Sequence, residues 1–293
     1  MKKALLTSEP MTDDQRRQLT RLGEDAMAKA LKTINPDKSG AQRIHARGDE
    51  VMKVVLDKVR ELSTSDQFAD EEVESSYAYP AGYRVKGMTE QTNILRQLIS
   101  GVGFADEKLT EKPLPDGAEG YFAIPRWQTI APTYREAVEK VFALLKKQRD
   151  GKFYNYREGR LDERYLRETE AQKAAFQKLG DEQKGYDILV VPAQFGLRHR
   201  GRSIRRAREV MSWNEFGLGA FAVGIMLFTH PERLVDYENL WIDCAGDEYA
   251  PDADGQFDYA PCFYFNVGKV RFHAYWFDDA HGHYGSASGF LPQ

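Results

Sequence analysis

The pattern of apolar and polar positions predicts three helices in the first third of the chain. Between Thr12 and Ile34, apolar residues recur at helical spacing behind a Thr-Asp-Asp-Gln start that resembles a capping box. A second helix is predicted from about Ala41 to Leu62, with valines and a leucine along one side, and a third from Thr89 to Ile99. Proline and glycine then cluster between Pro113 and Gly120, which is typical of a linker. We therefore expect a helical region over residues 1–112, a soft linker over 113–120 and a second region over 121–293.

Beyond the linker, helical and strand patterns alternate irregularly. The continuous β-branched run from Tyr186 to Val191 predicts a strand covered on both faces, and a helix is expected to follow from about Ser203. Leu240 to Cys244 is a second buried-strand candidate. Two apolar segments, Cys262–Asn266 and Lys269–Phe277, are separated by Val267-Gly268, which predicts an antiparallel hairpin. The fold class predicted is α+β: a helical N-terminal region followed by a mixed α/β domain with a buried strand-loop-helix unit and a C-terminal β-hairpin.

Composition is that of an ordinary globular protein. Of the 293 residues, 42% are apolar and 29% are charged, which excludes wholesale disorder. Only two cysteines are present, too few for a disulfide-stapled secreted scaffold, and the apolar stretch near the start is too short for a signal peptide. The most apolar run, Ala220–Phe228, is far shorter than a membrane helix requires. We therefore expect a soluble cytoplasmic protein that does not enter a membrane.

Charge is distributed unevenly along the chain. The net charge is only −4, so the whole molecule has no long-range attraction for nucleic acid. From Leu145 to Arg208, however, there are 17 Lys and Arg against 9 Asp and Glu, whereas from Glu232 onward there are 3 against 11. This asymmetry indicates either two interaction surfaces or two segments that neutralise each other inside the fold.

The sharpest local feature is the stretch from Arg198 to Arg208, which follows the predicted buried strand and contains six arginines and no acid. We call it the arginine-rich segment. Guanidinium groups bind phosphate bidentately, and the N-terminus of the following helix adds partial positive charge. We therefore expect this segment to bind the phosphates of a partner, with nucleic acid as the expected partner. The candidate binding residues are Arg198, His199, Arg200, Arg202, Ser203, Arg205, Arg206 and Arg208.

The same segment is similar to a nucleotide-binding P-loop but departs from it. Gly196 to Ser203 matches the fixed positions of the motif except that Arg202 replaces its lysine. Arginine cannot supply the compact charge that reaches the terminal phosphates, and four residues separate the apolar strand from the first glycine. We therefore do not expect nucleotide hydrolysis, although a degenerate phosphate-binding loop stays open.

A second constellation is acidic and lies between Asp243 and Asp258. It holds six carboxylates and no base, and clustered oxygens suit a hard cation such as Mg or Ca. The candidate metal ligands are Asp243, Asp247 and Glu248. The spacing does not match a twelve-residue calcium loop, and Asp252 to Gly255 is also ordinary turn chemistry. The arginines and these carboxylates can equally form an internal salt-bridge network that needs no ligand.

One weaker feature interleaves aromatic and basic residues. The run Phe153-Tyr154-Asn155-Tyr156-Arg157 resembles the lining of a nucleic-acid groove, although acids interrupt the sequence that follows and a charged helix face is the alternative.

Three functions follow from these features. The leading prediction is a non-catalytic cytoplasmic protein that binds a phosphate-bearing partner through the arginine-rich segment. The first alternative is a divalent-metal-dependent phosphoesterase or nuclease, and the second is a protein-interaction module with internally paired acidic and basic surfaces. Whether the protein is an enzyme stays open.

Overall fold

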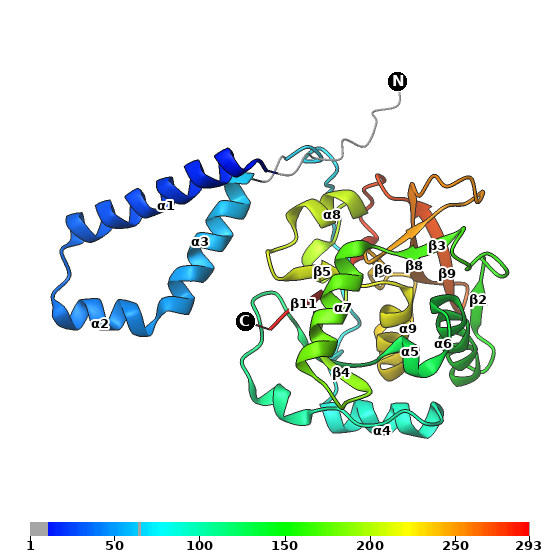
Figure 1. Cartoon of the computed structure of the whole chain (residues 1–293). Coiled ribbons are helices and arrows are strands. Elements are labelled where there is room, and N and C mark those ends of the chain that lie inside the picture. Colours follow the sequence, from blue (N-terminus) through cyan, green and yellow to red (C-terminus); the bar gives the residue numbers. More distant parts are fainter. Residues whose placement is uncertain (1–10, 64–65, 293) are drawn as a thin grey trace. The chain divides into compact units, whose positions relative to one another are not determined.

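The computed structural model describes residues 11–63 and 66–292, and the chain divides into two compact units, Met1–Val59 and Arg60–Gln293. The helical N-terminal region and the mixed region with two sheets confirm the α+β prediction (Figure 1). None of the helices in the described residues is long and apolar enough to cross a membrane.

The first unit is built from helices alone. These are α1 (Asp13–Ile34), α2 (Lys38–Ala46) and α3 (Gly48–Ser63), which runs past the unit boundary. The predicted capping box is confirmed, because the Thr12 hydroxyl accepts from the Gln15 backbone N–H and the Gln15 side chain accepts from Thr12. The single helix predicted over residues 41–62 is wrong. It is broken at Arg47 and Gly48, where glycine is a poor helix former and α3 begins anew.

The second unit contains two sheets. The smaller sheet has the order β1-β4-β11-β5, and every pairing in it is antiparallel. In the larger sheet β8 is central: it pairs with β6 and β7 and with β9, while β2 extends the β9 edge. The strands are β1 (Gly120–Pro125), β2 (Phe153–Asn155), β3 (Leu166–Glu168), β4 (Ile188–Gln194), β5 (Glu215–Gly217), β6 (Trp241–Asp243), β7 (Asp247–Tyr249), β8 (Tyr259–Asn266), β9 (Lys269–Trp276), β10 (Tyr284–Ser286) and β11 (Ser288–Phe290).

A fully buried helix forms the centre of the second unit. All ten residues of α9 are buried, and the helix packs against α6, where Gly224 lies so close to Val141 that a Cβ would meet it at 2.7 Å. The remaining helices are α4 (Met88–Leu98), α5 (Trp127–Ile130), α6 (Tyr134–Gln148), α7 (Glu170–Glu182), α8 (Ile204–Val210) and α9 (Ala220–Thr229), with short 3₁₀ turns η1 (Glu107–Glu111), η2 (Leu197–His199) and η3 (Pro231–Arg233).

Residues 113–120 lie inside the second unit, and the division between units falls at residues 59 and 60. The helix α4, which precedes residues 113–120, is tied to β1, which follows them. The Gln91 side chain accepts from the Ala123 backbone N–H and donates to the Tyr121 carbonyl. Because Gln91 is buried, these hydrogen bonds join both sides of the proline- and glycine-rich stretch into one core.

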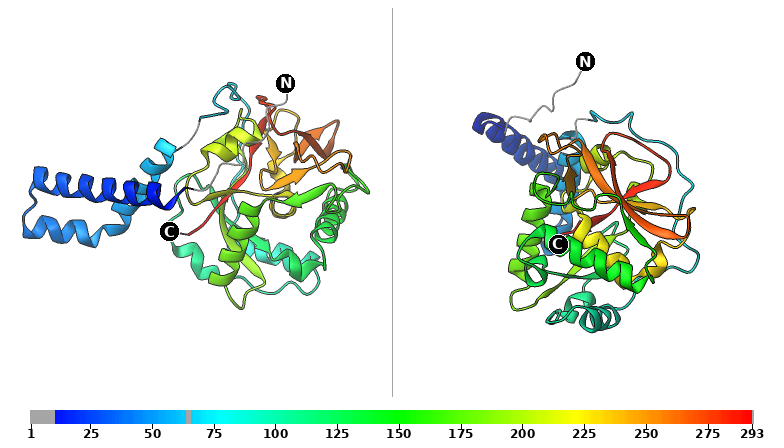
Figure 2. Two further views of the ribbon diagram at one scale, coloured as in Figure 1. Left: turned by 45° about the horizontal axis from the view of Figure 1, so that its top comes forward. Right: turned by 90° about the vertical axis from the view of Figure 1, so that its right-hand side faces the viewer.

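The two local motifs predicted in the second unit are confirmed. The hairpin pairs β8 with β9 around Val267 and Gly268, which both have positive φ as a two-residue hairpin turn requires (Figure 2, orange strands). The buried strand is β4, all seven residues of which are buried, and Ser203 caps α8 by accepting from the Arg206 backbone N–H.

Candidate functional site

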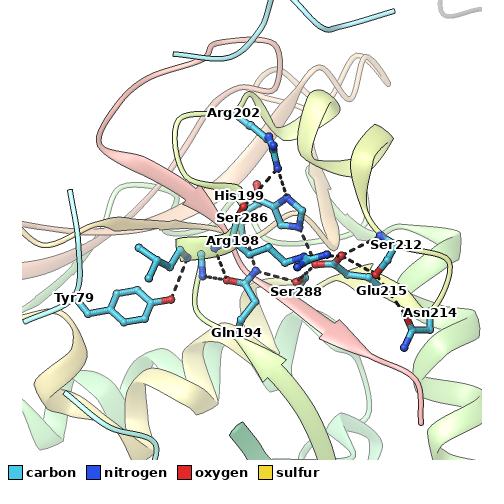
Figure 3. A network of polar contacts seen from close by, with 12 residues as sticks. Tyr79, Gln194, Arg198, His199, Arg202, Ser212, Asn214, Glu215, Ser286 and Ser288 are labelled. Atoms are coloured by element: carbon cyan, nitrogen blue, oxygen red, sulfur yellow. Dashed lines mark hydrogen bonds and ion pairs between the residues drawn. The ribbon is translucent and has the colours of Figure 1, made fainter. Parts of the chain in front are cut away.

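The arginine-rich segment leaves the end of β4 through a turn that the Gln194 side chain holds in place. Gln194 Oε1 accepts from the Gly196 backbone N–H, and the Gln194 side-chain amide donates to the Ser286 carbonyl and to the Ser288 hydroxyl, both at 2.8 Å (Figure 3). Gly196 has a φ of +117°, and a Cβ there would lie 2.5 Å from the Gly285 carbonyl oxygen. Only glycine fits this approach.

A buried histidine–carboxylate pair lies beneath this turn. The Glu215 carboxylate lies 2.7 Å from His199 Nε2 and accepts from the Ser288 hydroxyl at 2.6 Å (Figure 3). Burial by itself raises the pKa of Glu215, but these hydrogen bonds and those from Ser212 outweigh it and lower the pKa to about 2. Because Ser288 contacts the carboxylate and not the imidazole, the three residues fix the turn and do not form a nucleophile and its base.

The backbone of the turn has no donor left for a phosphate. A P-loop binds phosphate through free backbone N–H groups, whereas every N–H from Gly196 to Ser203 has an acceptor within the chain. The acceptors are Gln194 Oε1, the Tyr79 hydroxyl, and the carbonyls of Gly196, Leu197, Tyr284, His199 and Glu71. A degenerate phosphate-binding loop therefore has no free N–H here.

Most of the arginines in the segment are paired internally. Arg205 binds Glu71 in a bidentate arrangement, and Arg206, whose side chain is 11% exposed, reaches Glu72 at 2.6 Å. The guanidinium of Arg208 is buried and donates to the carbonyls of Ala245 and Asp247. The other ion pairs join Arg198 to Glu215, Arg202 to Glu72, Arg206 to Asp66 and Glu209, and Arg205 to Asp278. The predicted internal pairing thus exists, but its carboxylates come mainly from residues 66–72 and not from residues 243–258.

Arg200 differs from its neighbours. It is exposed, its guanidinium donates to the Tyr77 carbonyl at 3.2 Å, and no carboxylate among the described residues pairs with it. Of the six arginines, Arg200 is therefore the one that the described contacts leave for an external phosphate. Phosphate binding by the whole arginine-rich segment stays a prediction. Fewer of its guanidinium groups are available for a phosphate than the sequence suggested.

The three candidate metal ligands face different neighbours. Asp247 is fully buried and accepts from the Ala220 backbone N–H and the Tyr134 hydroxyl, while Glu248 turns the other way and binds Arg167 at 2.8 Å. Asp243 is buried, and no described residue donates a hydrogen bond to its carboxylate; burial raises its pKa to about 8. Among the described residues no group of three His, Cys, Asp or Glu side chains is arranged to hold a metal.

The larger sheet gathers aromatic and basic side chains on one face. Residues directly opposite each other in neighbouring strands point to the same side. The register places Tyr154 opposite Arg271, Arg271 opposite Tyr264, and Trp241 next to Tyr284. The alternate residues of these strands, among them Phe153, Phe272, Phe263 and Ile242, point to the opposite side and belong to the hydrophobic core. The first set therefore lies on the outer side of the sheet.

These side chains form a chain of touching rings across that outer side. Ring centroids lie 4.7 Å apart for Tyr154 and Tyr156, 5.0 Å for Tyr156 and His273, and 4.6 Å for the stacked pair His273 and Tyr275. The chain continues through Tyr275–Tyr284, Tyr284–Trp241, Trp241–Tyr264, Trp241–His283 and His283–Tyr77. We call this set, together with Arg271, the aromatic face.

Exposure varies along the aromatic face. Tyr154 and Tyr156 are 50% and 43% exposed, His273 and Tyr275 are half-buried, and Trp241 is buried. The sequence pointed to Tyr154 and Tyr156 but not to their neighbours. In β9, Arg271, His273 and Tyr275 alternate with apolar residues, which indicates that they share one face of the strand. That this face adjoins Tyr154 follows only from the pairing of β2 with β9.

Comparisons with known proteins leave the family open. No protein-family model matches the chain, and neither a curated protein nor a solved structure matches it.

Proposed function

We propose that the protein binds single-stranded nucleic acid on the aromatic face. The observation that supports this most is the adjacency of two exposed rings, Tyr154 and Tyr156, to the Arg271 guanidinium on the outer side of the sheet. The half-buried rings of His273 and Tyr275 continue this row. Unpaired bases stack on such rings regardless of sequence, and arginine planes serve the same purpose.

Charge around the exposed end of this face suits a phosphate backbone. The segments 150–160 and Lys269–Trp276 hold five basic residues, Lys152, Arg157, Arg160, Lys269 and Arg271, against the two acids Asp150 and Glu158. Lys152 and Lys269 are both exposed, and the Lys152 carbonyl accepts from the Val270 backbone N–H, so the two lysines lie at the same end of β2 and β9. This local excess of positive charge supplies the attraction that the net charge of −4 does not.

The aromatic face also connects to the arginine-rich segment. Its far end is the Tyr77 ring, which lies 3.8 Å from the His283 ring, and Arg200 donates to the Tyr77 carbonyl. A strand that follows the rings from the two lysines would reach Arg200 at the other end. The binding predicted for the arginine-rich segment is thereby proposed for Arg200, as one end of a larger surface.

A titration with labelled oligonucleotides tests this proposal. Single strands of about 16 nucleotides, the upper range of one single-strand binding module, are compared with duplexes of the same sequence by fluorescence anisotropy in EDTA. We expect the single strand to bind more tightly than the duplex, because duplex bases are stacked on each other and cannot stack on tyrosine. Equal affinity for both would indicate backbone attraction alone and would contradict the proposal.

A further inference from the structure

The second unit contains a cavity of about 480 Å³, and none of the residues of the aromatic face lies in its wall. It lies between the end of β1, the start of α6, α7 and the first turn of α9. Its walls are mostly apolar, and Trp127, Phe176, Leu189 and Phe221 contribute to them. A volume of this size holds a small organic molecule.

One carboxylate lines this cavity. Glu168 is the last residue of β3 and is half-buried, and its carboxylate accepts from the Gln172 amide at 3.0 Å. Burial raises its pKa above the ordinary value, while the hydrogen bond from Gln172, the positive charge of Lys173 and a hydrogen bond from Trp127 act in the opposite sense. No Lys or Arg side chain among the described residues forms an ion pair with Glu168.

The two cationic side chains of the cavity wall are engaged elsewhere. The Arg126 guanidinium donates to the carbonyls of Tyr186, Gly180 and Gln183. Lys173 pairs with Glu170 at 2.8 Å on the exposed side of α7. The carboxylate of Glu168 therefore faces the cavity with the charge of Lys173 nearby but with no cationic side chain of the described residues bound directly to it.

A second buried carboxylate lies behind the wall. Both oxygens of Asp247 lie 2.9 Å from the Tyr134 hydroxyl, and Tyr134 itself lines the cavity. Asp247 also caps the start of α9 by accepting from the Ala220 backbone N–H. This side of the cavity thus combines the Glu168 carboxylate with aromatic rings, which is the composition that selects organic cations.

We propose that this cavity binds a small organic amine, with the ammonium group at Glu168 and an aromatic or aliphatic body between Trp127, Phe176 and Phe221. A carboxylate in an apolar cavity is costly unless a cation compensates it, and a ligand ammonium supplies that cation. The ring of Trp127 adds a cation–π contact. This site is independent of the proposed nucleic-acid binding.

Calorimetric titration with 2-phenylethylamine tests the inference, and two isosteres serve as ligand controls. The neutral 2-phenylethanol and the anionic phenylacetate keep the ring but lack the ammonium group. We expect the amine to bind at least tenfold more tightly than either isostere. Equal binding of all three compounds would show that the cavity binds the ring without selecting the ammonium group. Tighter binding of phenylacetate would show that the cavity prefers an anion. Both results overturn the proposal.

Two variants of α7 and the adjoining strand locate the ammonium. Glu168→Gln should lower the affinity for the amine at least tenfold and leave that for phenylethanol unchanged, because only the charge is lost. Glu182→Gln changes an exposed acid at the other end of α7 and should leave amine affinity unchanged. Loss of affinity in both variants equally would overturn the assignment to Glu168. If Glu168→Gln does not fold, the wild-type comparison of amine and alcohol still decides.

Discussion

Tyr154 of β2 lies directly opposite Arg271 of β9, and the Arg271 guanidinium donates to the hydroxyl of Tyr156 two residues along. A parallel strand pair thus brings the aromatic run from the middle of the chain onto the same sheet face as the basic and aromatic residues near its end. The pairing of β2 with β9 therefore joins two segments that lie far apart in the sequence into one surface.

Arg271 is predicted to contribute to nucleic-acid binding, whereas Arg206 is predicted to contribute to the stability of the fold. Arg271→Ala removes a group from the aromatic face, and we expect the slope of log affinity against log salt for a single strand to fall by about 0.7, the loss of one phosphate contact. Its free energy of unfolding should change by less than about 1 kcal/mol, because the side chain is only half-buried. Anisotropy titrations at several salt concentrations measure the slope.

Arg206→Ala should instead destabilise the fold. The side chain is largely buried and forms ion pairs with Glu72, Asp66 and Glu209, so its loss removes three ion pairs at once. We expect the free energy of unfolding to fall by about 2–4 kcal/mol, measured by urea denaturation, while the folded variant keeps its nucleic-acid affinity. A variant that is stable but no longer binds would return the binding role to the arginine-rich segment.

Glu215→Gln is predicted to remove an acid-sensitive part of the stability. The folded pKa of about 2 lies below the ordinary value of 4.5, so the ionised carboxylate stabilises the fold above pH 4.5 and this contribution is lost as the pH falls toward 2. The shift corresponds to roughly 3 kcal/mol. We expect the variant to be less stable by about this amount near neutral pH and to show a flatter stability curve below pH 4.5. An unchanged acid limb would contradict the buried His199–Glu215 pair.

Asp243 is predicted to make the fold less stable as the pH rises, which is the opposite of the effect of Glu215. Its folded pKa of about 8 lies above the ordinary value of 3.8, so between these pH values the folded protein holds a proton that the unfolded chain has released. The free energy of unfolding should therefore fall as the pH rises through this window, by up to about 1.4 kcal/mol per pH unit. Asp247, with a folded pKa of about 8, adds to the same trend.

Asp243→Asn separates the two contributions. The amide is neutral at every pH, so the variant should lose part of the decline in stability between about pH 5 and about pH 8. Denaturant unfolding at both pH values measures this, and Glu158→Gln, the change of an exposed acid, serves as the control. A decline as steep as in the wild type would show that Asp243 is already ionised in the folded protein.

Local signals in the sequence were sufficient for the short-range structure. The Thr12 capping box, the start of a helix at about Ser203 and the Val267-Gly268 hairpin each depend on residues a few positions apart, and each is confirmed. The break at Arg47 and Gly48 was missed because the apolar pattern continues across it while a single weak helix former interrupts the backbone.

The candidate site depended on contacts that no local pattern contains. Glu71 and Glu72 lie in an irregular segment more than a hundred positions before the arginines that they pair with, so the sequence could assign those arginines only to an external anion or to the nearest acidic run. The aromatic face likewise requires the pairing of β2 with β9, and strand pairing across such separations is set by the packing of the whole unit.

The most direct test of the central claim compares two ring deletions in the same titration with a single strand. The double variant Tyr154→Ala, Tyr156→Ala removes the two most exposed rings of the aromatic face. Trp276→Ala removes a ring that is equally exposed, at 51%, but belongs to the set of β9 residues that point to the other side of the sheet. Stacking contributes about 1–3 kcal/mol per base, so we expect the double variant to bind at least about fivefold more weakly while Trp276→Ala binds like the wild type. Equal affinity of the double variant and the wild type would contradict nucleic-acid binding on this face.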